Sequence, residues 1–473
     1  GGRRRLSRLV VVSNRVPAES AKPAAGGLAV AMESALRDNG GLWFGWSGET
    51  VEGDPGPIEA SVRDGITYAT TDLNADSFRG YYEGYANQTL WPLFHYRVDL
   101  AVFDRSTFAH YHGVNKLFAE RLMPLLRDGD LVWVQDYHLI PLGEELRRLG
   151  CNIKLGFFLH TPFPTPEILT ILYNHRRLVR SLLSYDLIGF QSPTDLQSFQ
   201  DYVSRVLSNG RVEPDGTVSA HDLSVKAGVF PIGIEPQFFA ELATTRDALR
   251  YGQRVRDSLR RRPLILSVDR LDYSKGLPER IAGLYAMFEH YPEHRRRVTF
   301  MQIASPSRSE VPQYQDIRHE LDAAVGQING RFGRFDWVPV RYINRTYSHG
   351  VLAGLYRFAQ ICLVTPLRDG MNLVAKEYVA AQDPAGPGVL VLSKFAGAAH
   401  QMDGALIVNP YDARELGNVV HRALTMPEPE RLERWRTMMD RISRESLTWW
   451  RDSFVAALSS ERALTVEPVS GAP

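Results

Sequence analysis

Short apolar runs alternate with amphipathic helices from one end of the 473-residue chain to the other, and this alternation constrains the fold more than any other feature. Most of these runs are continuously apolar, which is typical of strands covered on both faces, as in parallel sheets. Strand and helix alternate over two separate sets of strands, which predicts two doubly wound α/β domains. The predicted strands are Leu9–Ser13, Leu131–Val134, Ile153–Leu159, Asp186–Phe190 and Lys226–Pro231, then Pro263–Val268, Val298–Ile303, Ile361–Thr365, Gly388–Leu392 and Ala405–Val408.

Two interruptions in this pattern suggest how the chain is divided. Two prolines and a glycine break the segment Pro231–Pro236, so we expect a first Rossmann-like domain over 1–236 and a second over 237–450. We expect the remainder, 451–473, to form a helix that returns to the first domain and ends in a frayed tail. Two such domains are expected to face each other across a deep cleft, with ligands at the carboxyl ends of the strands.

The charge balance and the missing motifs exclude several classes of protein. There are 55 Lys and Arg against 54 Asp and Glu, a net charge of +1, so no global field attracts nucleic acid or an anionic membrane. We find no apolar stretch of eighteen residues, no Walker A loop and no GxGxxG turn, which argues against a membrane span, a P-loop enzyme and a nicotinamide oxidoreductase. The two cysteines, Cys151 and Cys362, lie far apart in apolar contexts, so we expect free thiols and a cytoplasmic protein.

In the first half of the chain, polar and aromatic residues follow the predicted strands. Arg15 ends the first strand, and Gly27 belongs to a glycine pair at the start of the next helix, where backbone amides can bind an anion. Trp46, Tyr82 and Trp91 belong to aromatic clusters, which are usually core but can also supply flat surfaces for a sugar.

Asp136 and His160 each follow a predicted strand, and the two strands are neighbours in the first set. Such residues can simply cap the next loop. Two of them at one edge of a sheet favour a functional site.

In the second half, cations and carboxylates follow the strands. Arg270 and Lys275 flank one short turn, a pattern that suits a diphosphate, and Arg308 follows the next strand. Asp369 and Glu377 are separated by 377 − 369 = 8 residues, with Asn372 between them as the expected N-cap of a helix. This spacing resembles the donor-sugar signature of two-domain glycosyltransferases.

Taken together and in this order, the segments resemble the trehalose-6-phosphate synthases, retaining glycosyltransferases of the two-Rossmann-domain (GT-B) type. The resemblance extends from about Arg8 to Phe454. It rests on the segments Val12–Arg15, Gly26–Ala29, Leu42–Gly48, Asp136–His138, His160–Pro164, Arg270–Gly276 and Asp369–Glu377.

The resemblance implies transfer of glucose, with retention, from UDP-glucose or another nucleotide-glucose to glucose 6-phosphate, as part of trehalose biosynthesis and stress protection. The catalytic residues it implies are Asp136, His160, Arg270, Lys275 and Asp369. The implied acceptor-binding residues are Arg15, Trp46, Tyr82, Trp91, Asp136 and Arg308. The implied donor-binding residues are Gly27, His160, Arg270, Lys275, Asp369, Gly370, Met371, Asn372, Leu373, Val374 and Glu377.

On this interpretation Arg270 and Lys275 take the place of a divalent cation, so neither a metal nor another cofactor is expected. The expected partners are a nucleotide-sugar, a sugar phosphate and further copies of the chain in a homo-oligomer (dimer or tetramer), and neither nucleic acid nor a membrane. Two alternatives use the same fold: a pseudo-glycosyltransferase that joins cyclitols through nitrogen, and a non-catalytic sugar-phosphate sensor. The first should alter the acceptor clamp and the second should lose Arg270, Lys275 or Asp369, and neither change is found in the sequence.

Overall fold

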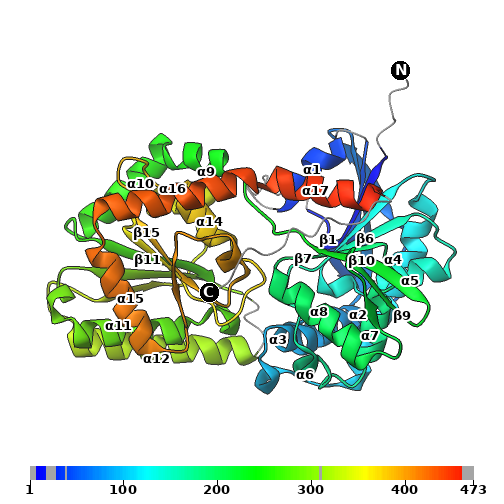
Figure 1. The fold of residues 1–473 in the computed structure, drawn as a ribbon, viewed down its shortest axis with the longest axis horizontal. Coiled ribbons are helices and arrows are strands. Elements are labelled where there is room, and N and C mark those ends of the chain that lie inside the picture. Colours follow the sequence, from blue (N-terminus) through cyan, green and yellow to red (C-terminus); the bar gives the residue numbers. More distant parts are fainter. Residues whose placement is uncertain (1–6, 18–27, 38–39, 308–311, 461–473) are drawn as a thin grey trace. The chain divides into compact units, whose positions relative to one another are not determined.

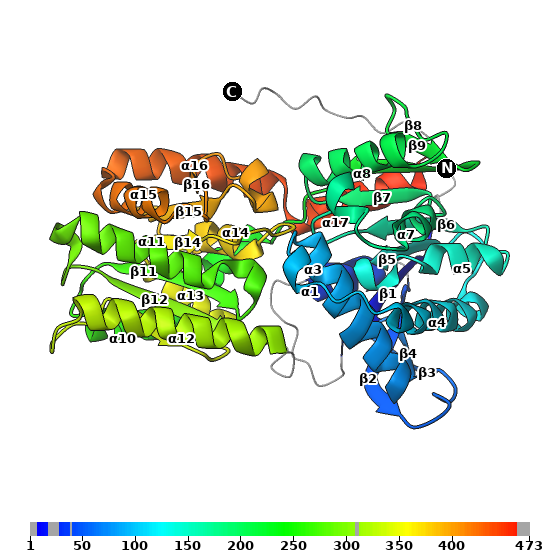
Figure 2. The ribbon, with the colours of Figure 1, turned by 90° about the horizontal axis from the view of Figure 1, so that it is seen from below.

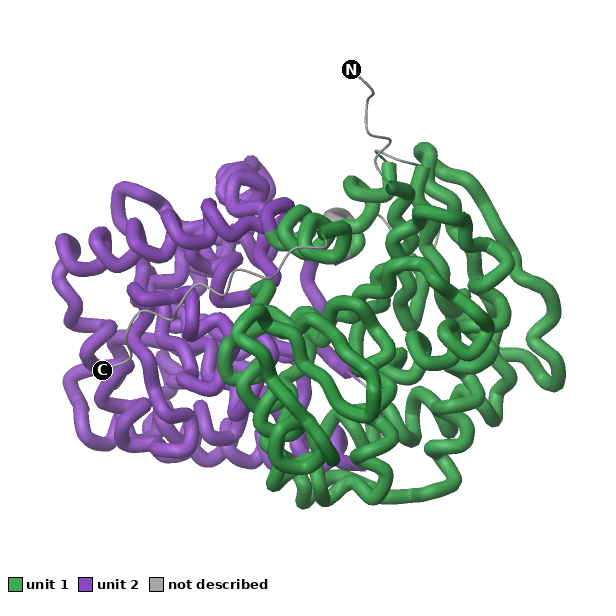
Figure 3. The backbone as a smooth tube through the Cα atoms, turned by 45° about the vertical axis from the view of Figure 1, so that its right-hand side comes forward, with its two compact units in different colours: residues 1–231, 450–473 green, residues 232–449 purple. Residues whose placement is uncertain are grey.

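The computed structural model describes residues 7–17, 28–37, 40–307 and 312–460. These residues form two compact units (Figure 3). Unit 1 contains the described residues of 1–231 and 450–473, and unit 2 contains 232–449. Each unit is built on its own, mostly parallel sheet with helices on both faces, so the chain has the two Rossmann-like domains that its sequence predicts.

The sheet of unit 1 has the strand order β3-β4-β2-β1-β5-β6-β7-β10-β9-β8. Neighbouring strands from β4 to β10 pair in parallel, and only β3, β9 and β8, toward the two edges, pair antiparallel. Figure 2 shows β2, β3 and β4 toward one edge and β8 and β9 at the other. The strands are β1 (Leu9–Arg15), β2 (Leu42–Val51), β3 (Glu59–Arg63), β4 (Ile66–Asn74), β5 (Leu131–Gln135), β6 (Lys154–Phe158), β7 (Leu187–Phe190), β8 (Arg211–Val212), β9 (Thr217–Ala220) and β10 (Leu223–Val229).

The helices of unit 1 cover both faces of this sheet, with α1 and α17 on one side and α4, α5, α7 and α8 on the other (Figure 1). They include a π-helix, η1. Their bounds are α1 (Leu28–Arg37), α2 (Ala75–Phe78), η1 (Arg79–Leu90), α3 (Trp91–Phe94), η2 (Val98–Leu100), α4 (Arg105–Leu122), η3 (Met123–Leu125), η4 (Tyr137–Leu139), α5 (Leu142–Arg148), α6 (Pro166–Leu169), α7 (His175–Leu182), α8 (Pro193–Val206) and α17 (Leu447–Ser459), which begins in unit 2 and enters unit 1 at Trp450.

The sheet of unit 2 has the order β13-β12-β11-β14-β15-β16, and all of its pairs are parallel. Helices α9, α10 and α16 lie on one side of it and α11, α12 and α15 on the other (Figure 1). The strands are β11 (Leu264–Arg270), β12 (Thr299–Ser305), β13 (Val340–Ile343), β14 (Ile361–Val364), β15 (Val389–Ser393) and β16 (Leu406–Val408). The helices are α9 (Pro236–Ala243), α10 (Arg246–Ser258), η5 (Tyr273–Lys275), α11 (Leu277–His290), η6 (Pro292–His294), α12 (Pro312–Phe332), α13 (His349–Phe358), α14 (Leu373–Ala380), η7 (Gly397–His400), α15 (Ala413–Thr425) and α16 (Glu428–Arg444).

The core of unit 1 includes an aromatic cluster that fixes α17 on the sheet. The ring of Phe454 stacks on Trp133 of β5 with centroids 4.4 Å apart and an interplanar angle of 7°. Gly156 and Gly189, on the adjacent strands β6 and β7, make room for this ring, since a Cβ at either position would lie within 3 Å of it. Two glycines on neighbouring strands therefore leave the space that the Phe454 ring of α17 fills.

Two features of the fold differ from the sequence-based expectation. Strands β2, β3, β4, β8, β9 and β13 were not predicted; β2 was interpreted only as an aromatic cluster, and β4 is rich in threonine and alternates between buried and half-buried positions. The helix expected after residue 450 begins earlier, at Leu447, as α17 (Leu447–Ser459), and the expected frayed tail lies outside the described residues. No helix in the described ranges is long and apolar enough to cross a membrane.

The first boundary between the units lies between Pro231 and Ile232, not after residue 236 as we expected. Hydrogen bonds join the segment 232–235 to residues 447 and 448 of unit 2. The Ile234 carbonyl accepts from the Leu447 amide at 2.9 Å, and the Glu235 carboxylate accepts from the Thr448 amide at 2.8 Å. Residue 236 is instead the first residue of α9.

We expect Phe454→Ala to lower the free energy of unfolding by about 3–5 kcal/mol, because it removes a fully buried ring and leaves a cavity between Trp133 and the two glycines. Urea denaturation measures this change. Phe335→Ala is the matched control, because the Phe335 side chain is 103% exposed and its loss should stay within about 0.5 kcal/mol of zero. Equal, small effects of the two variants would contradict the described packing.

Candidate active site

Each sheet has one point at which the strand order reverses. In unit 1, β1 is followed by β2 and β4 on one side and then by β5, β6, β7 and β10 on the other, and in unit 2 the same reversal occurs between β11 and β14. In open α/β sheets, ligands bind outside the carboxyl ends of the strands at this point. Arg15 ends β1 and Asp136 follows β5, while Arg270 ends β11 and Asp369 follows β14. The candidate residues therefore lie at the reversal point of each sheet.

Arg15 is held between an indole ring and a glycine. Its guanidinium carbon lies 5.7 Å from the ring centroid of Trp46, which is next to Arg15 in the pairing of β1 with β2. On Gly48, with φ of +98°, a Cβ would lie 2.7 Å from an Arg15 nitrogen. The backbone conformation at position 48 therefore favours glycine, and any larger residue would push the Arg15 guanidinium out of its place.

The π-helix η1 extends over 12 residues, Arg79–Leu90. π-helical segments are rare, mostly single turns, and often occur at functional sites. Hydrogen bonds tie η1 to the strand ends on both sides: the Tyr81 hydroxyl donates to Asn14 Oδ1 at 2.6 Å, and Asn87 Oδ1 accepts from the Tyr137 hydroxyl at 2.8 Å. This wider helix determines the direction in which the side chain of Tyr82 projects. It also determines the direction of Trp91, the first residue after the helix.

Ring contacts join the aromatic candidates of unit 1. The Tyr82 ring centroid lies 6.4 Å from that of Trp46 and 5.8 Å from that of His138. Trp91 is buried, and its ring lies 5.7 Å from that of Tyr137. The structure therefore brings Arg15, Trp46 and Tyr82 together, and it links Trp91 to them through the two residues that follow Asp136.

Asp136 and His160 are in direct contact, as their shared sheet edge predicts. The His160 amide donates to Asp136 Oδ1 at 3.1 Å. Asp136 has φ of +75°, a conformation that is uncommon for a residue other than glycine and that costs free energy.

The imidazole of His160 is neutral at physiological pH. Burial lowers its pKa to about 3. Nε2 lies 2.8 Å from Gln135 Oε1 and therefore carries the proton, while Nδ1 accepts from Gln191 Nε2 at 3.4 Å. Since both ring nitrogens have partners within the protein, the ring is fixed in orientation.

In unit 2, Lys275 forms an ion pair with Asp369. Its Nζ lies 2.5 Å from Asp369 Oδ2, and the same oxygen accepts from Asn372 Nδ2 at 3.2 Å. Arg270 lies at the exposed end of β11, five residues before Lys275. An ammonium group has three N–H donors, so Lys275 can bind Asp369 and a phosphate oxygen at the same time.

The loop after Asp369 leads into helix α14. Asn372 has φ of +80°, and its side chain accepts from the Ala375 amide at 3.4 Å, so it is the predicted N-cap. Leu373 and Val374 occupy the first turn of α14, where backbone amides lack partners within the helix. A sugar hydroxyl or a phosphate can accept from such amides.

Glycines let the loop pack closely against η7. The Gly397 amide donates to the Asp369 carbonyl at 3.1 Å, and the Ala398 amide donates to the Met371 carbonyl at 2.9 Å. A Cβ on Gly397 would lie 1.8 Å from the Gly370 carbonyl oxygen, so only glycine fits there. Further along α14, burial raises the pKa of Glu377 to about 7.

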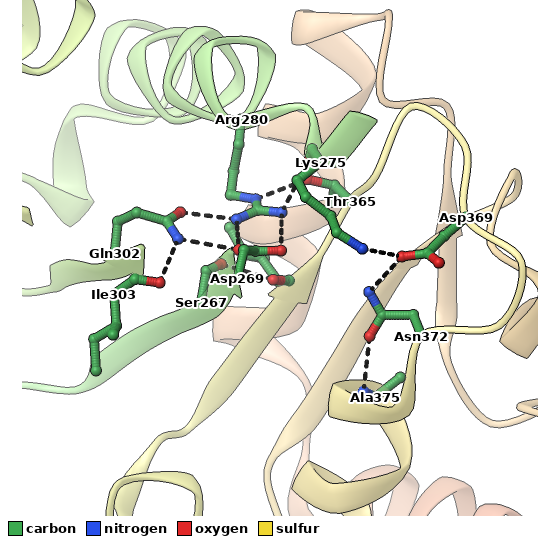
Figure 4. A network of polar contacts seen from close by, with 11 residues as sticks. Ser267, Asp269, Lys275, Arg280, Gln302, Ile303, Thr365, Asp369, Asn372 and Ala375 are labelled. Atoms are coloured by element: carbon green, nitrogen blue, oxygen red, sulfur yellow. Dashed lines mark hydrogen bonds and ion pairs between the residues drawn. The ribbon is translucent and has the colours of Figure 1, made fainter. Parts of the chain in front are cut away.

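Figure 4 shows the buried network beneath Lys275, which sequence reasoning missed. Arg280, on α11, has no exposed surface; it pairs with Asp269 at 2.5 Å and donates to Gln302 Oε1 at 2.8 Å and Thr365 Oγ1 at 2.8 Å. It also donates to the Lys275 carbonyl at 3.2 Å. Arg280 thereby connects β11, β12 and β14 to the loop that presents Lys275.

A sequence signal for this network existed. The apolar positions of α11 include Leu277, Ile281 and Leu284, and Arg280 lies on the same helix face, where a charge needs a buried partner. Two predicted site residues, Gly27 and Arg308, lie outside the described residues.

Comparison with known proteins gives a consistent family. The profile of a family described as Glycosyltransferase family 20 matches residues 7–460. A trehalose-6-phosphate synthase of Sinorhizobium fredii is 48% identical over 459 residues, covering 96% of this chain and 99% of the relative.

Solved structures with the same fold come from two further sources. The alpha,alpha-trehalose-phosphate synthase (UDP-forming) of Burkholderia xenovorans in complex with glucose-6-phosphate is 47% identical, with a TM-score of 0.91 over 96% of this chain and 100% of that chain. A structure from E. coli bound with UDP-2-fluoro glucose is 45% identical, with a TM-score of 0.91 over 96% of this chain and 99% of that chain.

We expect Arg280→Met to lower the free energy of unfolding by about 3–5 kcal/mol, because Asp269 would remain buried without its cation. Chemical denaturation of the purified variant measures the loss. The matched control is Arg270→Met, at the exposed end of the same sheet edge, for which we expect a change within about 0.5 kcal/mol. If Arg280→Met unfolded no more readily than Arg270→Met, the network of Figure 4 would not stabilise the loop that contains Lys275.

Proposed function

The chain belongs to glycosyltransferase family 20, and from this premise we propose that it is an α,α-trehalose-phosphate synthase that transfers glucose from UDP-glucose to glucose 6-phosphate, with retention. The products are α,α-trehalose 6-phosphate and UDP. The observation that carries this proposal is the Lys275–Asp369 pair at the reversal point of the second sheet. It occurs in a chain 47% identical, over nearly its whole length, to a synthase solved with glucose-6-phosphate.

The donor is proposed to bind chiefly to residues of unit 2. Arg270 and Lys275 neutralise the diphosphate, and the backbone at Gly27, from the residue range of unit 1, assists. Asp369 and the backbone from Gly370 to Val374 hold the hydroxyls of the transferred glucose, and Glu377 accepts from the ribose hydroxyls. The ion pair of Lys275 with Asp369 supports this assignment, because it places the group for the phosphate next to the group for the sugar.

The acceptor is proposed to bind chiefly to residues of unit 1. Arg15, Tyr82 and Trp91 hold the phosphate and ring of glucose 6-phosphate, with Trp46 against Arg15, and Arg308, from the residue range of unit 2, assists. Asp136 binds the acceptor sugar, and His160 is a further residue for the donor glucose. The contact of the His160 amide with Asp136 Oδ1 supports a shared role of these two residues in binding sugars.

In the proposed reaction, the bond between C1 of glucose and the β-phosphate oxygen breaks, and its electron pair stays on the phosphate. Arg270 and Lys275 stabilise the negative charge that develops there. The C1 hydroxyl of glucose 6-phosphate attacks from the same face, its oxygen bonds to the oxocarbenium-like carbon, and its proton passes to the departing phosphate oxygen. Asp136 and Asp369 both have binding roles, so the proposal uses no carboxylate nucleophile.

Three further properties belong to the proposal. No divalent cation or other cofactor is needed, because the two cations of unit 2 supply the positive charge. The protein acts in a reducing compartment, the cytoplasm, in keeping with the two buried free thiols, Cys151 and Cys362. It assembles into a dimer or tetramer of identical chains.

Release of UDP from UDP-glucose is the experiment that tests the function. We expect release that depends on glucose 6-phosphate and persists in a metal chelator, with α,α-trehalose 6-phosphate as the product. Binding of both ligands without UDP release would instead favour the sugar-phosphate sensor, and release that does not depend on glucose 6-phosphate would overturn the acceptor assignment.

Lys275→Ala and Arg270→Ala should each lower kcat by about 100-fold or more, because each removes a fixed cation from the leaving diphosphate. Steady-state kinetics with both substrates saturating measures the effect. Lys116→Ala, which removes an exposed lysine from α4, is the control and should leave kcat unchanged. An unchanged kcat in the Lys275 variant would refute the diphosphate role.

Arg15→Ala should raise the KM for glucose 6-phosphate by about 10-fold or more and leave the KM for UDP-glucose nearly unchanged, because a charge-assisted hydrogen bond to the acceptor phosphate is lost. Arg205→Ala, which removes an exposed arginine from the same unit, should change neither constant. An equal rise in both KM values in the Arg15 variant would contradict the assignment of Arg15 to acceptor binding.

A further inference from the structure

Within the segment 369–377, the proposed reaction gives no role to the side chain of Lys376. Lys376 lies on α14, between Ala375 and Glu377, and has no exposed surface. Its Nζ donates to the Ile232 carbonyl at 2.7 Å and to Gln401 Oε1 at 2.6 Å. Among the described residues it forms no ion pair. Burial lowers the pKa of Lys376 to about 7, although the nearby Glu445 carboxylate opposes this shift. A buried amine is costly to maintain, which argues for a role beyond packing.

One of its partners belongs to the segment that enters unit 2. Ile232 is the first residue of unit 2, and 232–235 pairs with 445–448, the segment just before the chain leaves unit 2 after Trp449. We call these two segments the paired connectors. They lie so close that a Cβ on Gly233 would be 2.4 Å from the Glu445 carbonyl oxygen.

The other partner joins Lys376 to the second connector and to the donor loop. Gln401 Nε2 donates to Glu445 Oε2. Gln401 directly follows η7, whose Gly397 amide donates to the Asp369 carbonyl. The donor loop is therefore hydrogen-bonded to η7, which Gln401 directly follows. Gln401 bonds to the second connector at Glu445 and accepts from Lys376, and Lys376 bonds to the first connector at Ile232.

We propose that Lys376 is a positioning residue for donor binding: it holds α14 and η7 in the arrangement that binds the nucleotide-sugar and transmits occupancy of the donor site to the paired connectors. This inference rests on the proposed function, which places the donor at Asp369–Glu377. It does not require Lys376 to touch the donor. Helix α14 also packs against α9 and α16, which directly follow the first connector and precede the second (Figure 1).

Lys376→Met tests this inference, because methionine keeps most of the length of the side chain and removes its donors. We expect the KM for UDP-glucose to rise by about 10-fold and the KM for glucose 6-phosphate to stay unchanged, since the two hydrogen bonds that hold α14 to Ile232 and Gln401 are lost. Hydrogen exchange gives the second readout. In the wild-type protein UDP should slow exchange of the Leu447 amide, which donates to Ile234, and this protection should be lost in the variant.

Gln401→Leu is a second variant, which keeps the inference testable even where Lys376→Met fails to fold. It removes the hydrogen bond from Gln401 to Glu445 and leaves the hydrogen bond from Lys376 to Ile232. We therefore expect UDP to slow exchange of the Leu447 amide less than it does in the wild-type protein. Ile328→Ala is the control for general destabilisation, because Ile328 is fully buried on α12 and is not part of this network. It should lower stability without a selective change in either KM.

The inference would be overturned if Lys376→Met or Gln401→Leu kept both the wild-type KM for UDP-glucose and the UDP-dependent protection of the Leu447 amide. Equal increases in both KM values, or the absence of UDP-dependent protection in the wild-type protein, would also overturn it. Absence of UDP release by the wild-type chain would overturn the proposed function and this inference with it, whereas normal release with unaffected network variants overturns this inference alone.

Discussion

The ion pair between Arg280 and Asp269 is the interaction on which the donor side of the site depends. It is buried in unit 2, and through the Lys275 carbonyl and Thr365 it fixes the loop after β11 and the end of β14. Lys275 and Asp369 project from these two segments. Because the molecule has a net charge of only +1, an anionic substrate has to be bound by such locally placed cations. A buried and internally neutral pair is one way to hold a second, partly buried cation, Lys275, in place.

Two residues of the candidate site also have strained backbone conformations. Asp136 in unit 1 and Asn372 in unit 2 both have positive φ, and each lies in the loop after a strand at the reversal point of its sheet. Such conformations cost about 1–3 kcal/mol and persist where the surroundings enforce them, which is common at functional sites. The His160 amide fixes Asp136, and the N-cap bond to Ala375 fixes Asn372. Hydrogen bonds to neighbouring residues therefore hold both strained conformations.

Much of this arrangement could be predicted from the sequence, because parallel strands leave their carboxyl ends at one sheet edge. That rule was enough to group Arg15 with Asp136 and His160, and Arg270 and Lys275 with Asp369. The π-helix η1 could not be predicted, since its side-chain pattern does not distinguish it from an α-helix and its ends are held by distant residues such as Asn14. The role of Arg280 was missed because its partners on β11, β12 and β14 come together only in the folded sheet.

Lys275 is proposed to recognise the β-phosphate, the group on which charge develops in the proposed reaction. Isothermal titration calorimetry with UDP and with UMP, on the wild-type protein and on Lys275→Ala, measures this recognition. The two nucleotides differ only in that phosphate, so their affinity ratio isolates its contribution. We predict that UDP binds the wild-type protein more tightly than UMP, and that this preference falls about 10-fold in the variant. An equal loss of affinity for both nucleotides, with the ratio unchanged, would show that Lys275 does not recognise the β-phosphate.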